Sequence, residues 1–115
     1  MIHGLDHART ALAPGLPVTL LSAPGAGAYA GCLWWREVLA QAGFTGPALL
    51  DCGDAPGRAL EALKLGLSGV ILSPAQAVVS QIGAAQGALV LTQAPPSLDL
   101  AQAGAARHLI AWLTG

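Results

Sequence analysis

Residues 62–74, with the sequence ALKLGLSGVILSP, are the stretch from which the fold can be predicted. An amphipathic helical pattern ends at Gly66, the apolar run 69–73 follows, and a Ser-Pro pair then begins a second helical pattern. A run of about five apolar residues without polar alternation is typical of a strand buried on both faces of a parallel sheet. The stretch therefore predicts a helix, a buried strand and another helix in direct succession.

The same alternation occurs along the rest of the chain. Strands are expected at 18–23, 48–52, 69–73 and 88–92, and helices at 28–42, 55–65, 74–86 and 99–113, after a leading segment 1–16 with a short helix in 4–13. Strands that alternate with helices form parallel sheets with right-handed crossovers. We expect one α/β domain over residues 1–115. Its four-stranded parallel sheet would be Rossmann-like or flavodoxin-like, in two or three layers, and the pattern leaves the strand order open.

Helix-terminating and helix-capping residues support these boundaries. Gly43 and Gly66 follow the helical patterns 28–42 and 55–65, as expected of glycines just beyond a helix end. Asp54 is expected to cap the helix at 55–65. Residues 73–76, Ser-Pro-Ala-Gln, resemble a capping box with proline at the first helical position.

Charged residues are scarce and unevenly placed. They make up 10% of the chain, with a net charge of −1, against about 25% in a typical domain. This excludes a nucleic-acid binder that relies on a basic face. No stretch has about 20 consecutive apolar residues, and prolines interrupt the apolar run 11–21. We therefore expect neither a membrane span nor a secretion signal, and a cytoplasmic location.

A glycine-rich stretch follows the first expected strand. Residues 25–30, GAGAYA, fit the pattern G-x-G-x-x-A at the start of a helix, and Asp51 ends the next strand. Residues 18–52 thus resemble the first βαβ unit of the Rossmann dinucleotide-binding family. The resemblance implies a phosphate held by the Gly25–Gly31 loop and a ribose hydroxyl held by Asp51. A smaller anion at the same loop is an alternative to a nucleotide, because no second nucleotide-binding half follows.

Polar residues gather where the expected strands end. Ligands of open parallel sheets bind beyond the carboxyl ends of the strands. Asp51 is the candidate acid or base there, Asp54 either caps a helix or has a functional role, and Arg58 could contact an anion. The full set of ligand-binding candidates is Ser22, Gly25, Gly27, Tyr29, Asp51, Asp54, Arg58, Ser73, Thr92 and Gln93.

No recognised catalytic or metal motif accompanies these residues. The chain has no G-x-S-x-G, Walker lysine or H-E-x-x-H pattern. His3 and His7 have helical metal spacing but no third ligand in sequence, so no metal is expected. Cys32 and Cys52 do not form a C-x-x-C pair and are expected to be reduced thiols.

Two broader resemblances add no activity. Residues 55–94 are similar to a βα segment of aldolase-type barrels, but Lys64 falls on a helix whereas the Schiff-base lysine of those enzymes sits on a strand. As a whole, the chain resembles small uncharacterised α/β proteins with no assigned activity.

The distribution of charge suggests that part of the surface is covered. Residues 65–98 contain no charged side chain, and Trp34 and Trp112 are expected outside the apolar helix faces. Aromatic residues are enriched and charges depleted in interfaces. We therefore expect a homo-oligomer, most simply a dimer, through an apolar surface that includes Trp34 or the 74–86 helix. Three functions follow in order of preference: a self-associating module, a binder of a small anionic ligand, and an enzyme that uses Asp51.

Overall fold

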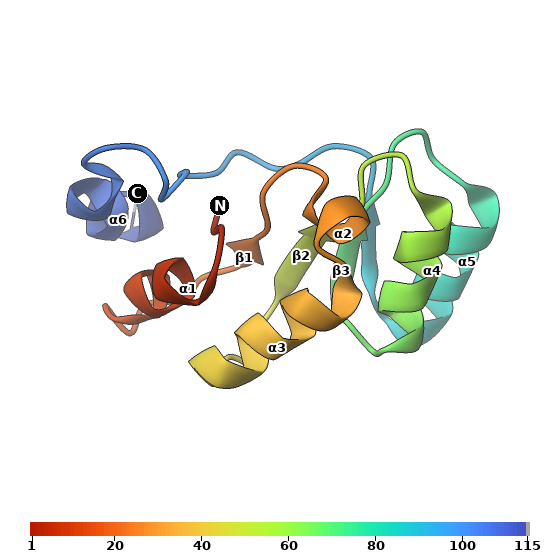
Figure 1. Ribbon diagram of the computed structural model, residues 1–115, viewed down its shortest axis with the longest axis horizontal. Helices are drawn as coiled ribbons and strands as arrows, with labels where there is room; N and C mark the ends of the chain where they lie inside the picture. The colour runs from red at the N-terminus through yellow and green to blue at the C-terminus, as the bar shows by residue number, and fades with distance from the viewer. Residues whose placement is uncertain (115) are drawn as a thin grey trace.

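The computed structural model describes residues 1–114 and has the predicted α/β architecture, with helices around one four-stranded parallel sheet. Figure 1 shows the order of the elements along the chain. The strands are β1 (Leu20–Leu21), β2 (Ala48–Asp51), β3 (Gly69–Ile71) and β4 (Leu89–Leu91), and the helices are α1 (Leu5–Leu12), α2 (Ala26–Tyr29), α3 (Cys32–Ala42), α4 (Pro56–Lys64), α5 (Ala77–Gln86) and α6 (Ala105–Thr114).

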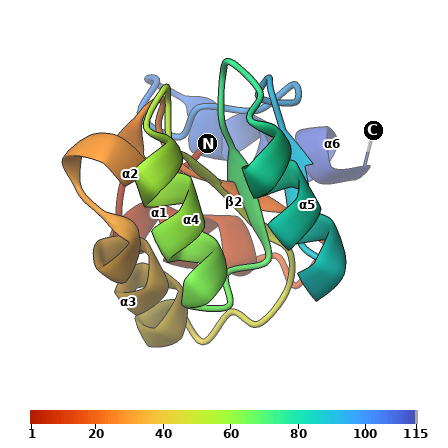
Figure 2. The same ribbon diagram turned by 90° about the vertical axis from the view of Figure 1, so that its right-hand side faces the viewer.

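The strands follow one another across the sheet in the order β1-β2-β3-β4. Each pairs in parallel with the next one along the chain. Because every right-handed crossover then runs in the same direction, the connecting helices lie on one face of the sheet, and α3, α4 and α5 lie side by side in front of it in Figure 2. The order never reverses, so the sheet has no topological switch point of the kind where doubly wound folds bind ligands.

The two faces of the sheet are packed differently. On the helix-covered face, Leu50 and Val70 are buried in the main core together with Trp35 of α3. The opposite face has a smaller cluster of Leu21, Leu49 and Ile71, which are 3% exposed each. The main core therefore lies between the sheet and the crossover helices, and the second face depends on other segments for cover.

The start of the chain and the segment before α6 supply part of that cover. Ile2 forms a parallel bridge with Ser22 at the outer edge of β1. The Met1 nitrogen donates to the Leu98 carbonyl at 2.6 Å, and the Leu100 N–H donates to the Met1 carbonyl at 3.1 Å. The chain from β4 thus crosses the width of the sheet, and α6 lies at the opposite end of the molecule from α4 and α5 (Figure 1).

Several predicted helix boundaries were wrong. The helix expected at 28–42 is two helices, because Gly31 has φ 91° and ψ 163°, outside the helical region, between α2 and α3. The last helix begins at Ala105 rather than at 99. The carboxylate of Asp99 accepts the Ala101 N–H at 2.9 Å, and such a local bond favours a turn over a helix.

Both predicted N-terminal caps were wrong as well. Helix α4 is preceded by Ala55 and begins at Pro56, so the Asp54 side chain caps nothing. Helix α5 is preceded by Gln76 in an extended conformation, with no capping bond from a side chain. Gly43 and Gly66 do have positive φ just past α3 and α4, as expected.

Candidate functional site

Hydrogen bonds tie together the carboxyl ends of β1, β2 and β3. The buried Ser22 hydroxyl accepts the Asp51 N–H at 2.9 Å and donates to the Ala23 carbonyl at 3.1 Å. The Gly53 N–H donates to Asp51 Oδ1 at 2.8 Å, and the Gly53 carbonyl accepts the Ser73 N–H at 2.9 Å. Ser22, Asp51, Gly53 and Ser73 form what we call the carboxyl-edge cluster. Three of its members were candidates from the sequence.

The charged candidates do not converge with Asp51. Asp54 is exposed, and Arg58 Nη1 donates to Glu61 Oε2 at 3.1 Å, one turn further along α4. The ion pairs of residues 1–114 are Arg58–Glu61 and His3–Asp99, so Asp51 has no cationic partner among them. Asp51 is half-buried with one oxygen engaged by a backbone N–H. The other carboxylate oxygen of Asp51 remains available as a hydrogen-bond acceptor. No second titratable group of the cluster is bonded to Asp51.

The glycine-rich turn packs against β2. Gly25 has φ 71°, and a Cβ on Gly27 would lie 2.9 Å from Cys52 Sγ. The Ala28 N–H donates to the Gly25 carbonyl at 2.9 Å and is therefore already used within the turn. Helix α2, which follows, has only four residues, so its dipole is small. Close packing against β2 is thus sufficient to explain why residue 27 is a glycine, and no bound phosphate is needed to explain it.

The remaining candidates lie apart from the cluster or face solvent. Tyr29 is 72% exposed. Thr92 and Gln93 follow β4 and are also exposed. No hydrogen bond described for residues 1–114 joins the side chains of these three residues to the carboxyl-edge cluster.

The two cysteines are buried and unbonded to each other. Burial raises the pKa of the Cys52 thiol to about 12, with smaller contributions from Cys32 and from the Asp51 carboxylate. Burial also raises the pKa of Cys32, and Glu61 adds to that shift. Because the thiolate is the nucleophilic form, neither thiol is activated in this environment.

His3 and His7 are engaged within the protein. The His3 N–H donates to His7 Nδ1 at 3.1 Å, and His3 Nε2 lies 2.7 Å from Asp99 Oδ1. The Ala101 N–H, and then His3, lower the pKa of Asp99. Across residues 1–114, no three His, Cys, Asp or Glu side chains are grouped so that they could hold a metal ion.

Comparison with known proteins finds no relative for this chain: no protein-family model, curated protein or solved structure matches it. Within residues 1–114, no helix combines the length and apolar character needed to span a membrane.

A second surface lies at the sheet edge that β4 forms. Among residues 1–114, β4 pairs with β3 only, so its other edge faces no strand. Helix α5 lies beyond α4 at one end of the molecule (Figure 1) and buries only Val79 and Gly83. Its Val78 is 59% exposed and its Ile82 37%, while Leu89 on β4 is 53% exposed. Ile82 faces α4 beside Glu61 and Lys64. Leu89, by contrast, lies on the second face of the sheet with Leu91. We call these exposed positions at the β4 end of the sheet, Val78, Ile82 and Leu89, the α5/β4 surface.

The two tryptophans expected at an interface have different surroundings. Trp34 is half-buried and packs against the main core, with its ring centroid 5.9 Å from that of Trp35. Trp112 on α6 is 48% exposed. Of the two surfaces suggested by the sequence, the 74–86 helix exposes Val78 and Ile82, whereas Trp34 is half-buried.

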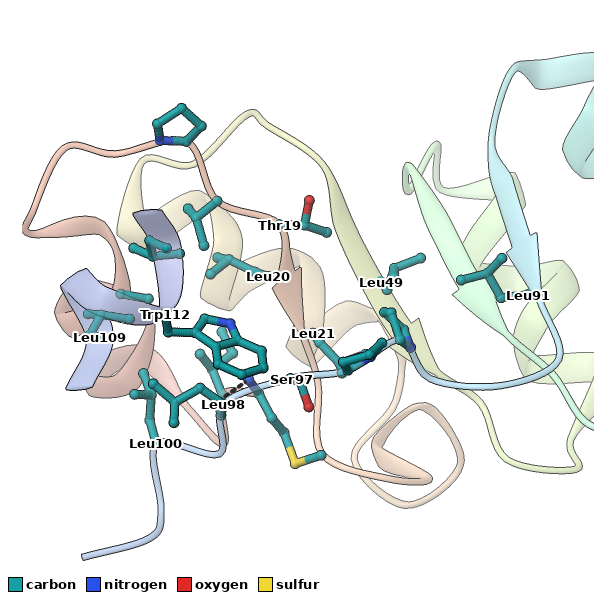
Figure 3. Close-up of a pocket in the computed structure, with 18 of the residues that line it drawn as sticks. Thr19, Leu20, Leu21, Leu49, Leu91, Ser97, Leu98, Leu100, Leu109 and Trp112 are labelled. Carbon is teal, nitrogen blue, oxygen red and sulfur yellow. Dashed lines mark hydrogen bonds between the residues drawn. The ribbon is translucent and has the colours of Figure 1, made fainter. Parts of the chain in front are cut away.

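Sequence reasoning placed no site on the second face of the sheet. The structure has a cavity of about 440 Å³ there, between the sheet, the 95–100 segment and α6. Figure 3 shows Leu21, Leu49 and Leu91 on the strands and Leu109 and Trp112 on α6 around it. The apolar stripe of the last helix was visible in the sequence, but the strand face opposite it could not be assigned without the strand order.

Proposed function

We propose that this protein is an α/β module that associates with a second copy of itself through the α5/β4 surface. The observation that supports this most directly is the exposure of Val78, Ile82 and Leu89 in a tract, residues 65–98, without a single charged side chain. Exposed large apolar side chains in a segment without charges are typical of interfaces.

The open edge of β4 favours an identical partner. Natural sheets protect exposed edges with lysine, proline or inward charges, and residues 88–92, ALVLT, have none of these. Two edges related by a two-fold axis can pair antiparallel and extend the sheet. The strand edge itself, residues 88–92, has no charged side chain, so two copies can meet there without like-charge repulsion.

Helix α5 must provide much of the contact area. A stable interface buries roughly 800 Å² on each partner. Strand β4 has three residues and offers too little surface for that by itself. Nearly all of α5 outside Val79 and Gly83 is accessible, so the helix and the strand edge together are the surface we assign to the dimer. The free, buried thiols of Cys32 and Cys52 fit the reducing cytoplasm as its location.

Sedimentation equilibrium of the chain, with and without Val78→Glu, tests this function. A buried, unpaired carboxylate should weaken the dimer more than tenfold, because desolvating a charge costs several kcal/mol. Leu33→Glu on α3 is the matched control, since Leu33 is 56% exposed against 59% for Val78 and lies outside the tract. A chain that sediments as a monomer at high micromolar concentration, or a dimer weakened equally by both variants, would refute the proposal.

A further inference from the structure

The cavity on the second face of the sheet has the size of a small-molecule site. Its volume of about 440 Å³ lies within the range of roughly 300–1,000 Å³ typical of ligand pockets. The cavity is partly open to solvent, so a ligand can enter it without unfolding the chain. At an interior packing density of roughly 0.75, the cavity would take about 330 Å³ of ligand atoms, enough for a medium-length alkyl chain or a fused-ring skeleton.

The wall of the cavity is mainly apolar. Leu21, Leu49 and Leu91 line it from the sheet, and Leu109 and Trp112 line it from α6 (Figure 3). Pro95, Pro96 and Leu98 line it from the segment that crosses the sheet. The occupant would thus contact mostly leucine, proline and indole groups.

Among the residues that the structure describes, no ionisable side chain lines this cavity, and the one charged group at its wall is the Met1 α-ammonium, which donates to the Leu98 carbonyl at 2.6 Å. The polar side chains in the wall are the hydroxyls of Thr19 and Ser97 and the indole of Trp112. A carboxylate or phosphate would have to draw the Met1 ammonium away from the Leu98 carbonyl, and burial lowers the pKa of the ammonium and so disfavours its charged form. A neutral ligand with one hydroxyl or carbonyl group would suffer no such penalty and could bond to Thr19 or Ser97.

The position of α6 explains how a ligand could reach this wall. Helix α6 buries only Ala105 and Leu109, and it is joined to β4 by residues 92–104 without a strand or another helix between them. The side chain of Trp112 borders the cavity and is also half-exposed. An occupant would add apolar contacts to α6, and each buried methylene contributes about 0.8 kcal/mol.

We propose that this cavity binds one uncharged, largely apolar small molecule between the second sheet face and α6. The site is distinct from the α5/β4 surface, apart from Leu89, which belongs to both. Tests of the two proposals can therefore use residues that belong to only one of them, such as Ser97 for the cavity and Val78 for the interface.

Titration calorimetry with decanol and decanoate distinguishes the chemistry of the ligand. The two probes share a chain length and differ in charge. We expect decanol to bind the full chain at least tenfold more tightly than decanoate at neutral pH. Ser97→Trp should fill part of the cavity and weaken decanol binding at least tenfold, whereas Thr45→Trp, at an exposed loop position, should leave it unchanged.

A second variant keeps the proposal testable if Ser97→Trp does not fold. Ser97→Lys places an ammonium group at the wall and should shift the preference toward decanoate. Absence of decanol binding, equal binding of both probes, or insensitivity to both Ser97 variants would overturn the proposal. So would a finding that Ser97→Trp dissociates a dimer, because the cavity would then hold a second copy. Val78→Glu should bind decanol normally whether or not the chain self-associates.

Discussion

The change in stability on replacing Gly83 with alanine measures how closely α5 packs against β4. A Cβ at position 83 would overlap Cγ2 of Val90, whereas the next neighbouring atom outside Val90, the Ala88 carbonyl oxygen, is 3.6 Å away. Overpacking of this kind costs about 1–3 kcal/mol. Alanine in a helix interior is favoured over glycine by about 1 kcal/mol, which offsets part of that cost. Gly83→Ala alone should therefore destabilise the protein by up to about 2 kcal/mol.

The effect should reverse when the obstructing methyl group is removed. In a Val90→Ala background, Gly83→Ala should stabilise the protein by up to about 1 kcal/mol, because only the helix propensity remains. Urea unfolding followed by circular dichroism gives the four free energies of this cycle. Gly57→Ala on α4 is the control, since a Cβ there meets nothing within 4 Å and should not couple to Val90. A coupling below about 0.5 kcal/mol between positions 83 and 90 would refute the packing of α5 on β4 described above.

Three further predictions concern the core and the carboxyl edge. Burial raises the pKa of the Cys52 thiol from 9.0 to about 12, so the folded protein holds this proton more tightly than the unfolded chain does. The resulting contribution to the free energy of unfolding is complete below pH 9 and is lost as the pH rises toward 12. The free energy of unfolding should fall by at most about 4 kcal/mol over this pH range. Urea unfolding of Cys52→Ala at the same pH values should not show this fall. Gly27→Ala should lower the unfolding free energy by about 1–3 kcal/mol, because its Cβ would also lie 3.1 Å from the Asp51 carbonyl, and an unchanged melting temperature would contradict this. Leu50→Ala should cost about 2–5 kcal/mol, against less than about 0.5 kcal/mol for the exposed Leu33→Ala.

The carboxyl-edge cluster shows how far site prediction from this sequence can go. The rule that parallel strands end at one edge correctly brought Ser22, Asp51 and Ser73 to the same side of the sheet. It could not show that the Ser22 hydroxyl would be used to join β1 to β2, or that Arg58 would turn toward Glu61. Those outcomes depend on which hydrogen-bond partner lies nearest to each side chain in the folded backbone. The distances between such groups cannot be derived from the sequence pattern.

Local pattern alone was sufficient for the elements themselves. Apolar runs such as 69–73 predicted each strand, because burial on both faces leaves no room for polar alternation. Gly43 and Gly66 predicted helix ends, because a left-handed residue after a helix favours glycine. These signals act over a few residues, so they can be recognised without knowing the rest of the fold.

Only the tertiary structure decided the strand order, the break between α2 and α3, and the faces that remain accessible. The sequential order places the crossover helices on one side of the sheet, so the second face depends on Met1, the 95–100 segment and α6 for its cover. Strand order depends on contacts between residues far apart in the chain, which a periodicity cannot specify. The charge-free tract 65–98 was evident from the sequence, but its exposure on α5 and β4 became evident only when the sheet ended at β4.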